Sequence, residues 1–396
     1  MSWIVWLLLP RVSGYYAHEG AVELPLLRRT RPPTTLPSLR GVQDNTLALT
    51  NRLGTQYLVP IRLNDDIFHV QVDTGSADLW VGCEFVDSPS HCSPPVGACS
   101  NASSTELVYG SGRVCLDARR GAFQLGSLAI PQVSYSIGKS ALLTDGSQGI
   151  LGLAFSRISP FVNHSNTSFP MHHLDSFSLT LSSGVNSAGS KLILNGVDHS
   201  RIASHGLIGV TLPLIEAAHW TVSMDDMVVD GQPWSVCGSL CPCKAIVDSG
   251  TTFLSMPPSV FDQFAATYLA PHGCTMAPSD AYFVCPHTAM KHLPTLRLVL
   301  HRHPFSLQRS DYTWQLSPKS FLVQLQPSAV AHTWVLGDTF LKVYPITFHV
   351  RARALTIYCA HGRCRGGPAV PWEVDQLPQI GESNVLGTTT STSCPS

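Results

Sequence analysis

Two short stretches of this 396-residue chain are nearly identical, and they constrain the fold more than any other feature. The first reads VDTGS and contains Asp73, and the second reads VDSGT and contains Asp248. Apolar residues come directly before each aspartate. Much further along the chain an apolar-apolar-Gly stretch follows, Ile150-Leu151-Gly152 after Asp73 and Val335-Leu336-Gly337 after Asp248. Internal similarity of this kind indicates two related units, in each of which a buried strand delivers an aspartate into a glycine turn.

Short β-type segments dominate the chain between about residues 57 and 359. The runs YLVPIRL and IFHVQV flank Asn64-Asp65-Asp66, which predicts a hairpin, and similar runs include KLILNGV, TLRLVLHRH and ALTIYCA. The best helical segment is PPSVFDQFAATYLA, which has Pro257 and Pro258 at its start. We therefore predict a mainly β protein with two lobes that divide between about residues 197 and 213.

The composition indicates a folded protein from an oxidising compartment. Hydrophobic residues make up 44% of the chain and charged residues 13%, which excludes a disordered chain, and the net charge of −1 suggests no nucleic-acid partner. The 12 cysteines are an even number, and glycosylation sequences predict modification at Asn101, Asn163 and Asn166. The 17 histidines lack zinc-helix spacing, and a metal site at CGSLCPC fits a secretory protein poorly, so we expect no metal and no cofactor.

The N-terminal region favours a secreted precursor. Residues 1–18 contain a short apolar core, too short to span a bilayer, and predict a signal peptide. Residues 19–50 are basic and Pro-rich, which we interpret as a cleavable pro-segment, although a simple linker has the same composition. A first β lobe is then expected over 51–205, a second over 206–365, and a Pro/Ser/Thr-rich tail over 366–396. No later stretch reaches about 18 apolar residues, so we expect no transmembrane anchor.

The residues beside each aspartate suit two turns that meet. Gly75 and Gly250 permit close approach of the backbone, because glycine has no Cβ. The hydroxyls of Thr74 and Ser249 can donate to the opposite loop and lock the pair together. Either turn alone is typical of an ordinary hairpin or Asx turn, whereas the matched pair indicates one joint site.

If the two turns meet, their carboxyls can act as an acid and a base. If Asp73 and Asp248 approach about a pseudo-two-fold axis, they can share one proton, because two carboxylates this close do not both ionise easily. The hydroxyls of Ser76 and Thr251 can hydrogen-bond the carboxylates and favour their charged form. A pair of this kind can activate a water toward a peptide carbonyl and protonate the departing amine.

From about Tyr57 to Ala360 the chain resembles the pepsin-like family of aspartic endopeptidases. VDTGSADLWVG resembles the family's first active-site loop, with Trp80 as its tryptophan, and ELVYGSGRV resembles the mobile flap with Tyr109. QGILGLAF, CGSLCPCKAIVDSGTTFL and WVLGDTFLKVY follow in the family's order. DSGTT with VDHS is similar to the memapsin (beta-secretase) branch, while CGSLC and HLPTLRL are closer to pepsin, so no subfamily is assigned.

The resemblance implies a bilobal pepsin-like acid protease fold, with two β lobes related by a pseudo-two-fold axis and the active-site cleft between them. It implies that Asp73 and Asp248 are the catalytic dyad, and that Tyr109 closes over an extended peptide and hydrogen-bonds to Trp80. The other site residues it implies are Gly75, Gly110, Ser111, Gly250 and Thr251 at the substrate, and Thr74, Ser76 and Ser249 as support for the dyad.

The resemblance also implies three disulfide bonds, Cys92–Cys99, Cys237–Cys241 and Cys274–Cys285. Two cysteines outside the pepsin pattern, Cys83 and Cys115, are candidates to link the base of the flap to the first active-site loop. Sequence alone pairs none of the remaining six, Cys83, Cys115, Cys243, Cys359, Cys364 and Cys394.

These features together predict an aspartic-type endopeptidase that acts as a monomer on polypeptide substrates. We expect a zymogen of the secretory pathway, extracellular or in an acidic endolysosomal or vacuolar lumen, whose basic pro-segment covers the carboxylates until low pH releases it. The main alternative is a catalytically silent binding or inhibitor protein on the same scaffold, and a remoter one is an acid glycosidase with two carboxylates. The physiological substrate, pH optimum and activation site stay open.

Overall fold

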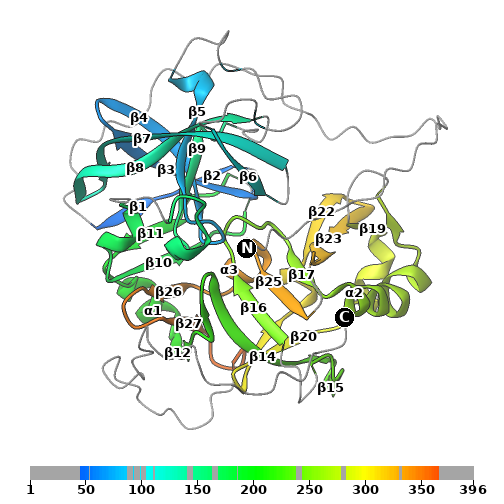
Figure 1. The fold of residues 1–396 in the computed structure, drawn as a ribbon. Coiled ribbons are helices and arrows are strands. Elements are labelled where there is room, and N and C mark those ends of the chain that lie inside the picture. Colours follow the sequence, from blue (N-terminus) through cyan, green and yellow to red (C-terminus); the bar gives the residue numbers. More distant parts are fainter. Residues whose placement is uncertain are drawn as a thin grey trace, which may run out of the picture.

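The computed structural model describes residues 45–364, except 53, 87–91, 93–98, 100–103, 110–111, 141–145, 163–167, 185, 238–242, 278–281 and 330–331. Strands dominate this part of the chain and form two lobes, the first blue to cyan and the second green to orange in Figure 1. The predicted mainly β, bilobal fold is therefore confirmed. Several predictions lie outside the described residues: the signal peptide, most of the pro-segment, the tail, the three glycosylation sites, Gly110, Ser111, Cys241 and Cys394.

An eight-stranded sheet builds the first lobe, in the order β2-β3-β4-β9-β5-β8-β7-β6. Its strands are β2 (Thr50–Arg52), β3 (Gln56–Leu63), β4 (Asp66–Asp73), β5 (Leu79–Gly82), β6 (Thr105–Tyr109), β7 (Gly112–Leu125), β8 (Leu128–Ser140) and β9 (Gly149–Gly152). Leu63 pairs with Asp66, so the predicted hairpin has a two-residue turn. Asn64 has a φ of 52° there, a left-handed conformation that asparagine tolerates better than most residues.

The second lobe contains a larger sheet and a small one. The larger sheet has the order β21-β20-β14-β16-β25-β17-β24, with β13 and β15 also paired to β14, and the small sheet has the order β18-β19-β23-β22. The strands are β13 (Glu216–Ala217), β14 (Trp220–Val229), β15 (Gln232–Pro233), β16 (Cys243–Val247), β17 (Leu254–Met256), β18 (Thr275–Met276), β19 (Phe283–Pro286), β20 (Leu296–Leu300), β21 (His303–Leu307), β22 (Thr313–Ser317), β23 (Ser320–Val323), β24 (Leu325–Pro327) and β25 (Thr333–Leu336).

A six-stranded sheet draws strands from both lobes, in the order β1-β11-β10-β26-β27-β12. Its strands are β1 (Thr46–Ala48), β10 (Ser176–Thr180), β11 (Lys191–Leu194), β12 (Ile208–Pro213), β26 (Ile346–His349) and β27 (Ala354–Cys359). Phe177 of β10 pairs with Phe348 of β26, and their rings stack with centroids 4.7 Å apart. Trp220 meets both rings edge-on, so an aromatic cluster holds this sheet to the second lobe.

Helices are few and short among the described residues. Helix α1 (His199–His205) begins where the Asp198 carboxylate accepts a bond from the Arg201 N–H. The predicted helical segment forms α2 (Pro258–Phe264), which continues as a π-helical turn over Ala265–Leu269, and α3 spans Asp338–Leu341. None of the helices in the described part of the chain is long and apolar enough to cross a membrane. Short 3-10 helices cover Cys83–Phe85, Ser156–Ile158, Pro170–His173, Ala270–His272, His287–His292 and Arg309–Asp311.

The disulfide bonds correct part of the sequence prediction. Cys274–Cys285 is present as predicted. The bond Cys92–Cys99 is wrong, because each cysteine is tied to the sheet instead: Cys92 bonds Cys83, directly after β5, and Cys99 bonds Cys115 on β7. These two bonds also exclude a direct link between Cys83 and Cys115. Another disulfide bond among the described residues joins Cys359 to Cys364.

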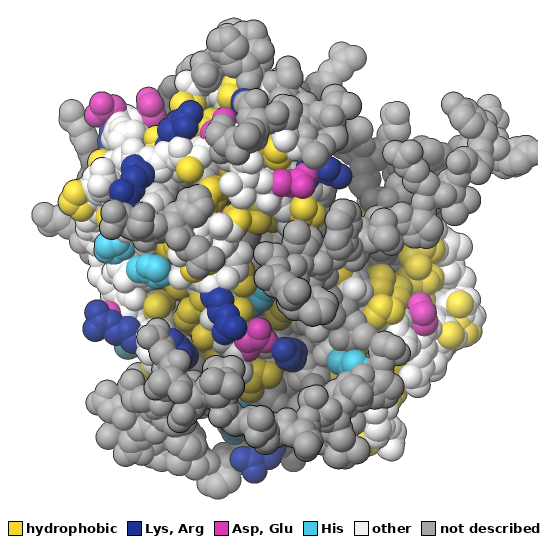
Figure 2. Space-filling view, viewed as in Figure 1, with side chains coloured by type: hydrophobic (Ala, Val, Ile, Leu, Met, Phe, Trp, Pro, Cys, Tyr) yellow, Lys and Arg dark blue, Asp and Glu magenta, His cyan; other side chains and the backbone are white. Residues whose placement is uncertain are grey.

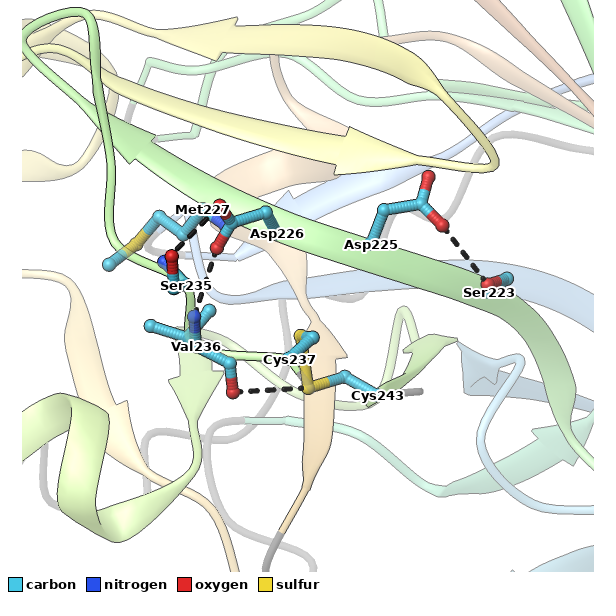
Figure 3. The surroundings of a disulfide bond; sticks show 8 residues. All are labelled: Ser223, Asp225, Asp226, Met227, Ser235, Val236, Cys237 and Cys243. Atoms are coloured by element: carbon cyan, nitrogen blue, oxygen red, sulfur yellow. Dashed lines mark hydrogen bonds between the residues drawn. A yellow bond between two sulfur atoms is a disulfide. The ribbon is translucent and has the colours of Figure 1, made fainter. Parts of the chain in front are cut away.

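The predicted bond Cys237–Cys241 is also wrong, because Cys237 bonds Cys243 at the start of β16 (Figure 3). The neighbouring backbone is held by the Asp226 carboxylate, which accepts the N–H groups of Ser235 at 3.2 Å and Val236 at 3.0 Å. This anchor fixes the path that brings Cys237 to β16. The spacing of the cysteines in the sequence does not reveal such a path.

The two lobes repeat one strand arrangement at the point where each aspartate emerges. In the first lobe β9 pairs parallel with β4 and antiparallel with β5. In the second lobe β25 pairs parallel with β16 and antiparallel with β17. The internal similarity in the sequence therefore corresponds to a repeated three-strand unit, and Asp73 and Asp248 leave equivalent ends of it.

Candidate active site

The glycines of the two apolar-apolar-Gly strands make room for the aspartate turns. A Cβ on Gly152 would lie 2.5 Å from the carbonyl carbon of Ala77, and a Cβ on Gly337 would lie 2.3 Å from the carbonyl oxygen of Thr251. Both distances are far below van der Waals contact with backbone atoms that have little freedom to move. Only glycine lets each turn rest directly against its supporting strand, which explains why the sequence repeats this residue.

Four hydrogen bonds join the two turns across the lobes, with Thr74 and Ser249 in equivalent roles. The Thr74 hydroxyl donates to the carbonyl of Val247 at 3.0 Å and accepts the Ser249 N–H at 2.9 Å. The Ser249 hydroxyl donates to the carbonyl of Val72 at 2.8 Å and accepts the Thr74 N–H at 3.1 Å. Both hydroxyls are buried, so this frame is shielded from competing water. It fixes the relative position of the two aspartates.

Each carboxyl packs against the glycine of the opposite turn. A Cβ on Gly75 would lie 2.4 Å from Cγ of Asp248, and a Cβ on Gly250 would lie 2.3 Å from Oδ1 of Asp73. The same glycines also bind the carboxyl of their own turn, because their N–H groups donate to Asp73 Oδ1 at 2.8 Å and to Asp248 Oδ1 at 2.7 Å. The two glycines thus allow the carboxyls to approach each other and orient them.

A hydroxyl binds the second oxygen of each carboxyl. Ser76 Oγ donates to Asp73 Oδ2 at 2.5 Å, and Thr251 Oγ1 donates to Asp248 Oδ2 at 2.6 Å. The pKa of Asp73 is raised to about 7. Burial causes most of this rise and the negative charge of Asp248 adds to it, while the hydrogen bonds from Ser76 and Gly75 oppose it. The two carboxyls therefore keep a shared proton well into the acidic range.

The flap tyrosine makes the hydrogen bond expected from the sequence. Trp80 Nε1 donates to the Tyr109 hydroxyl at 2.8 Å. Trp80 is fully buried, and Tyr109 packs on an apolar cluster that includes Trp80, Ile150 and Phe161. Gly112, which pairs with Tyr109, has a φ of 150°, a backbone conformation that favours glycine. The hairpin of β6 and β7 thus depends on glycine at this position, and its tip lies outside the described residues.

Sequence reasoning missed a third carboxyl near the site, Asp78, which follows the first turn. Asp78 is 5% exposed and accepts a 2.6 Å hydrogen bond from Ser159 Oγ, and Ser159 Oγ also accepts the N–H of Phe161 at 3.0 Å. Burial raises the pKa of Asp78 to about 6, although the Ser159 bond lowers it. The available signal was the aspartate inside SADLW, directly before a buried strand.

A fourth carboxyl lies behind the second turn. Asp338 begins α3, is fully buried, and its N–H donates to the carbonyl of Thr251 at 2.8 Å. Burial raises the pKa of Asp338, and the negative charge of Asp248 adds to the rise, while Lys342 opposes it. The sequence analysis quoted this aspartate within WVLGDTFLKVY but gave it no role. No group of His, Cys, Asp or Glu in the described part of the chain is arranged to hold a metal ion.

Comparison with known proteins agrees with this geometry. The family described as Eukaryotic aspartyl protease matches residues 56–358. Gastricsin of Callithrix jacchus is 27% identical over 309 residues, which cover 71% of this chain and 75% of the gastricsin. Pepsin A of Sus scrofa is 27% identical over 325 residues, 76% of this chain and 80% of the pepsin. Pregnancy-associated glycoprotein 2 of Bos taurus is 27% identical over 338 residues, 78% of this chain and 83% of that protein.

A solved structure supports the fold independently. The crystal structure of an aspartic proteinase from Irpex lacteus superposes with a TM-score of 0.64 and covers 80% of this chain and 97% of its own, at 17% identity. The family match spans both aspartate turns, strands β6 and β7, and most of the sheet that draws strands from both lobes. The chain therefore belongs to the eukaryotic aspartyl protease family and is an aspartic-type endopeptidase.

Proposed function

We propose that Asp73 and Asp248 are the catalytic dyad and that the enzyme cleaves peptide bonds under acidic conditions. The observation that carries the proposal is the matched environment of the two carboxyls. Each has a glycine N–H on one oxygen and a hydroxyl on the other, and each packs on the glycine of the opposite turn. The raised pKa of Asp73 leaves one proton on the pair at acidic pH.

Hydrolysis needs one ionised and one protonated carboxyl. The ionised member takes a proton from a water whose oxygen attacks the peptide carbonyl carbon, and the protonated member gives its proton to the carbonyl oxygen. In the tetrahedral species the carboxyl that took the proton of the water gives it to the amide nitrogen, the C–N bond breaks, and the other carboxyl takes a proton back from a hydroxyl on the tetrahedral carbon as the acid and the amine leave. The proton that began on the dyad is restored, so the pair returns to its starting state. Since the carboxyls titrate as a unit, no single residue is assigned the acid role.

The flap, formed by β6 and β7, would bind the substrate. Tyr109 is held by Trp80 and lies next to the first turn, so strands β6 and β7 can close over an extended polypeptide. Gly75, Gly250 and Thr251 would then contact the peptide backbone near the scissile bond. Such closure excludes water from the dyad, which strengthens the electrostatic contacts there.

The cellular setting remains part of the same proposal. The predicted signal peptide, the glycosylation sequences and the disulfide bonds support a secreted or endolysosomal enzyme that acts as a monomer. The basic residues Arg28, Arg29 and Arg31 support a zymogen, because their attraction to an ionised dyad fades as the carboxyls gain protons.

The test uses the full-length precursor. Purified protein is incubated at pH 3 to 5 and at pH 7 with an unfolded protein substrate, with and without a statine-type inhibitor. We expect inhibitor-sensitive cleavage at acidic pH, and a loss of at least about 10³-fold in Asp73→Asn and Asp248→Asn, because each removes half of the acid–base pair. Asp262→Asn, at an exposed site on α2, is the matched control.

Two outcomes would contradict the proposal. Full activity in Asp73→Asn would show that the dyad does no chemistry. A folded wild-type precursor without activity at any pH would favour the alternative of a silent binding protein.

A further inference from the structure

A histidine that the catalytic proposal does not use lies beside the dyad. His219 occupies the turn between β13 and β14, directly before Trp220. Trp220 Nε1 donates to the carbonyl of Leu153 at 2.8 Å, and the Leu153 N–H donates to the carbonyl of Asp73 at 2.7 Å. Two hydrogen bonds therefore connect the residue after His219 to the backbone of a dyad aspartate.

Asp248 follows β16, the strand that pairs with β14 next to His219. Thr221 pairs with Glu216 on one side and with Ile246 on the other, and Ile246 lies two residues before Asp248. The half-buried His219 side chain is thus close enough to Asp248 and to the Glu216–Lys244 pair to feel their charges. The negative charges of Asp248 and Glu216 both act on this imidazole.

Charged side chains of both signs surround His219. Lys244 Nζ lies 2.8 Å from Glu216 Oε2, and the side chains are 52% and 41% exposed. Arg157, exposed on the opposite lobe, also acts on Glu216. Figure 2 shows Lys or Arg side chains next to an acidic side chain near the middle of the face, over the region of β16. With His219 protonated, the charged groups here are three cations and two acids, Glu216 and Asp248.

The protonation of His219 depends on these neighbours. Burial lowers the pKa of His219, and Lys244 lowers it too, whereas the negative charges of Asp248 and Glu216 oppose this shift. The hydrogen bond from Lys244 lowers the pKa of Glu216, so this acid stays ionised in mild acid. Because its pKa is lowered, His219 gains its proton at a lower pH than an exposed histidine does.

We propose that His219 is a specificity-determining residue that, with Arg157 and Lys244, favours a substrate with an acidic side chain next to the scissile bond. A carboxylate there would meet a protonated imidazole and the two flanking cations, of which only Lys244 has a bonded acidic partner among the described side chains. The proposal rests on the proposed catalytic function, because it concerns the substrate of the same site. The competing explanation is a histidine that only packs in its turn.

The experiment measures kcat/KM for peptide pairs in which Glu replaces Gln at one position at a time, on either side of the scissile bond. At pH 5 a substrate Glu is largely ionised. We expect at least one position at which wild-type enzyme prefers Glu by about 5-fold, the size of a partly exposed charge interaction. His219→Gln should bring this ratio close to one while it still cleaves the Gln peptide, which shows that the variant is folded.

Controls separate the possible outcomes. His199→Gln, at an exposed site on α1, should keep the wild-type ratio. The wild-type ratio should also fall at higher pH, where the imidazole is neutral, over whatever range the enzyme stays active. A Glu preference that is the same in wild type and His219→Gln, or no Glu preference at any position, overturns this inference but leaves the proposed catalytic function intact. If none of the peptides is cleaved, including the Gln series, the proposed function fails and this inference fails with it.

Discussion

Replacing Asp78 with asparagine tests whether buried carboxyls adapt this protein to acid. Asp78 is buried, and burial raises its pKa from the ordinary value of 3.8 to about 6. Asparagine has nearly the same shape and keeps an oxygen that can accept the bond from Ser159, but it cannot ionise. The substitution therefore removes one titration and little else.

The sign follows from which state releases its proton first. Because the pKa of Asp78 is higher in the folded state, the unfolded chain ionises first as the pH rises, and folding stability falls between about pH 4 and pH 6. A shift of about 2 units corresponds to about 3 kcal/mol of unfolding free energy. The wild type should lose this amount between pH 4 and pH 7, and Asp78→Asn should not. Asp73 and Asp338, whose pKa values are also raised, contribute the same sign in both proteins and cancel.

The assay is urea unfolding followed by tryptophan fluorescence at pH 4 and at pH 7, under non-reducing conditions. The measured quantity is the loss of unfolding free energy between the two pH values in wild type minus the same loss in the variant. Asp262→Asn, at an exposed position, should give a difference near zero. A difference near zero for Asp78→Asn as well would refute the reasoning, whatever the absolute stability of the variant.

Two further substitutions probe the frame of the site. Thr74→Val should lower the unfolding free energy by about 2–4 kcal/mol, because it removes two buried hydrogen bonds and leaves the Ser249 N–H and the Val247 carbonyl unpaired; unchanged urea unfolding would contradict this. Tyr109→Phe should lower kcat/KM by roughly 10-fold and the unfolding free energy by about 1–3 kcal/mol, since the buried Trp80 N–H loses its acceptor and the flap loses its anchor; peptide hydrolysis rates measure the first effect, and a wild-type rate would show that the bond does not hold the flap.

The sequence predicted those parts of the site that depend on residues close together in the chain. The turns at Asp73 and Asp248 carry their own glycines and hydroxyls, and the structure places each of these where the residue type suggested. The hairpin at Asn64 was equally predictable, because a two-residue turn needs only local backbone preferences. The repeat also predicted the bilobal architecture, since two similar units with one aspartate each imply a joint site.

Other features depend on contacts between distant segments and were not readable. The partner of Asp78 is Ser159, far along the chain, and the residues around Asp78 do not reveal that partner. The partners of Cys92 and Cys99 likewise depend on which strands their loop follows. His219 gains its surroundings from a strand register that sets Glu216 and Lys244 side by side. Spacing along a chain does not define such registers.

The sheet shared by the lobes sets a limit on when this protease can become active during synthesis. Strand β10 belongs to the first lobe, yet one of its edges is covered only by β26, near the end of the folded body. A ribosome makes the chain from the N-terminus, so the first lobe emerges with an open strand edge and without Asp248. A nascent chain cannot bring Asp248 to Asp73 until the strands that support the second turn have been made, and its first lobe stays incomplete until Ile346–His349 arrive. The order of synthesis itself therefore delays proteolytic activity in the compartment where the protein folds.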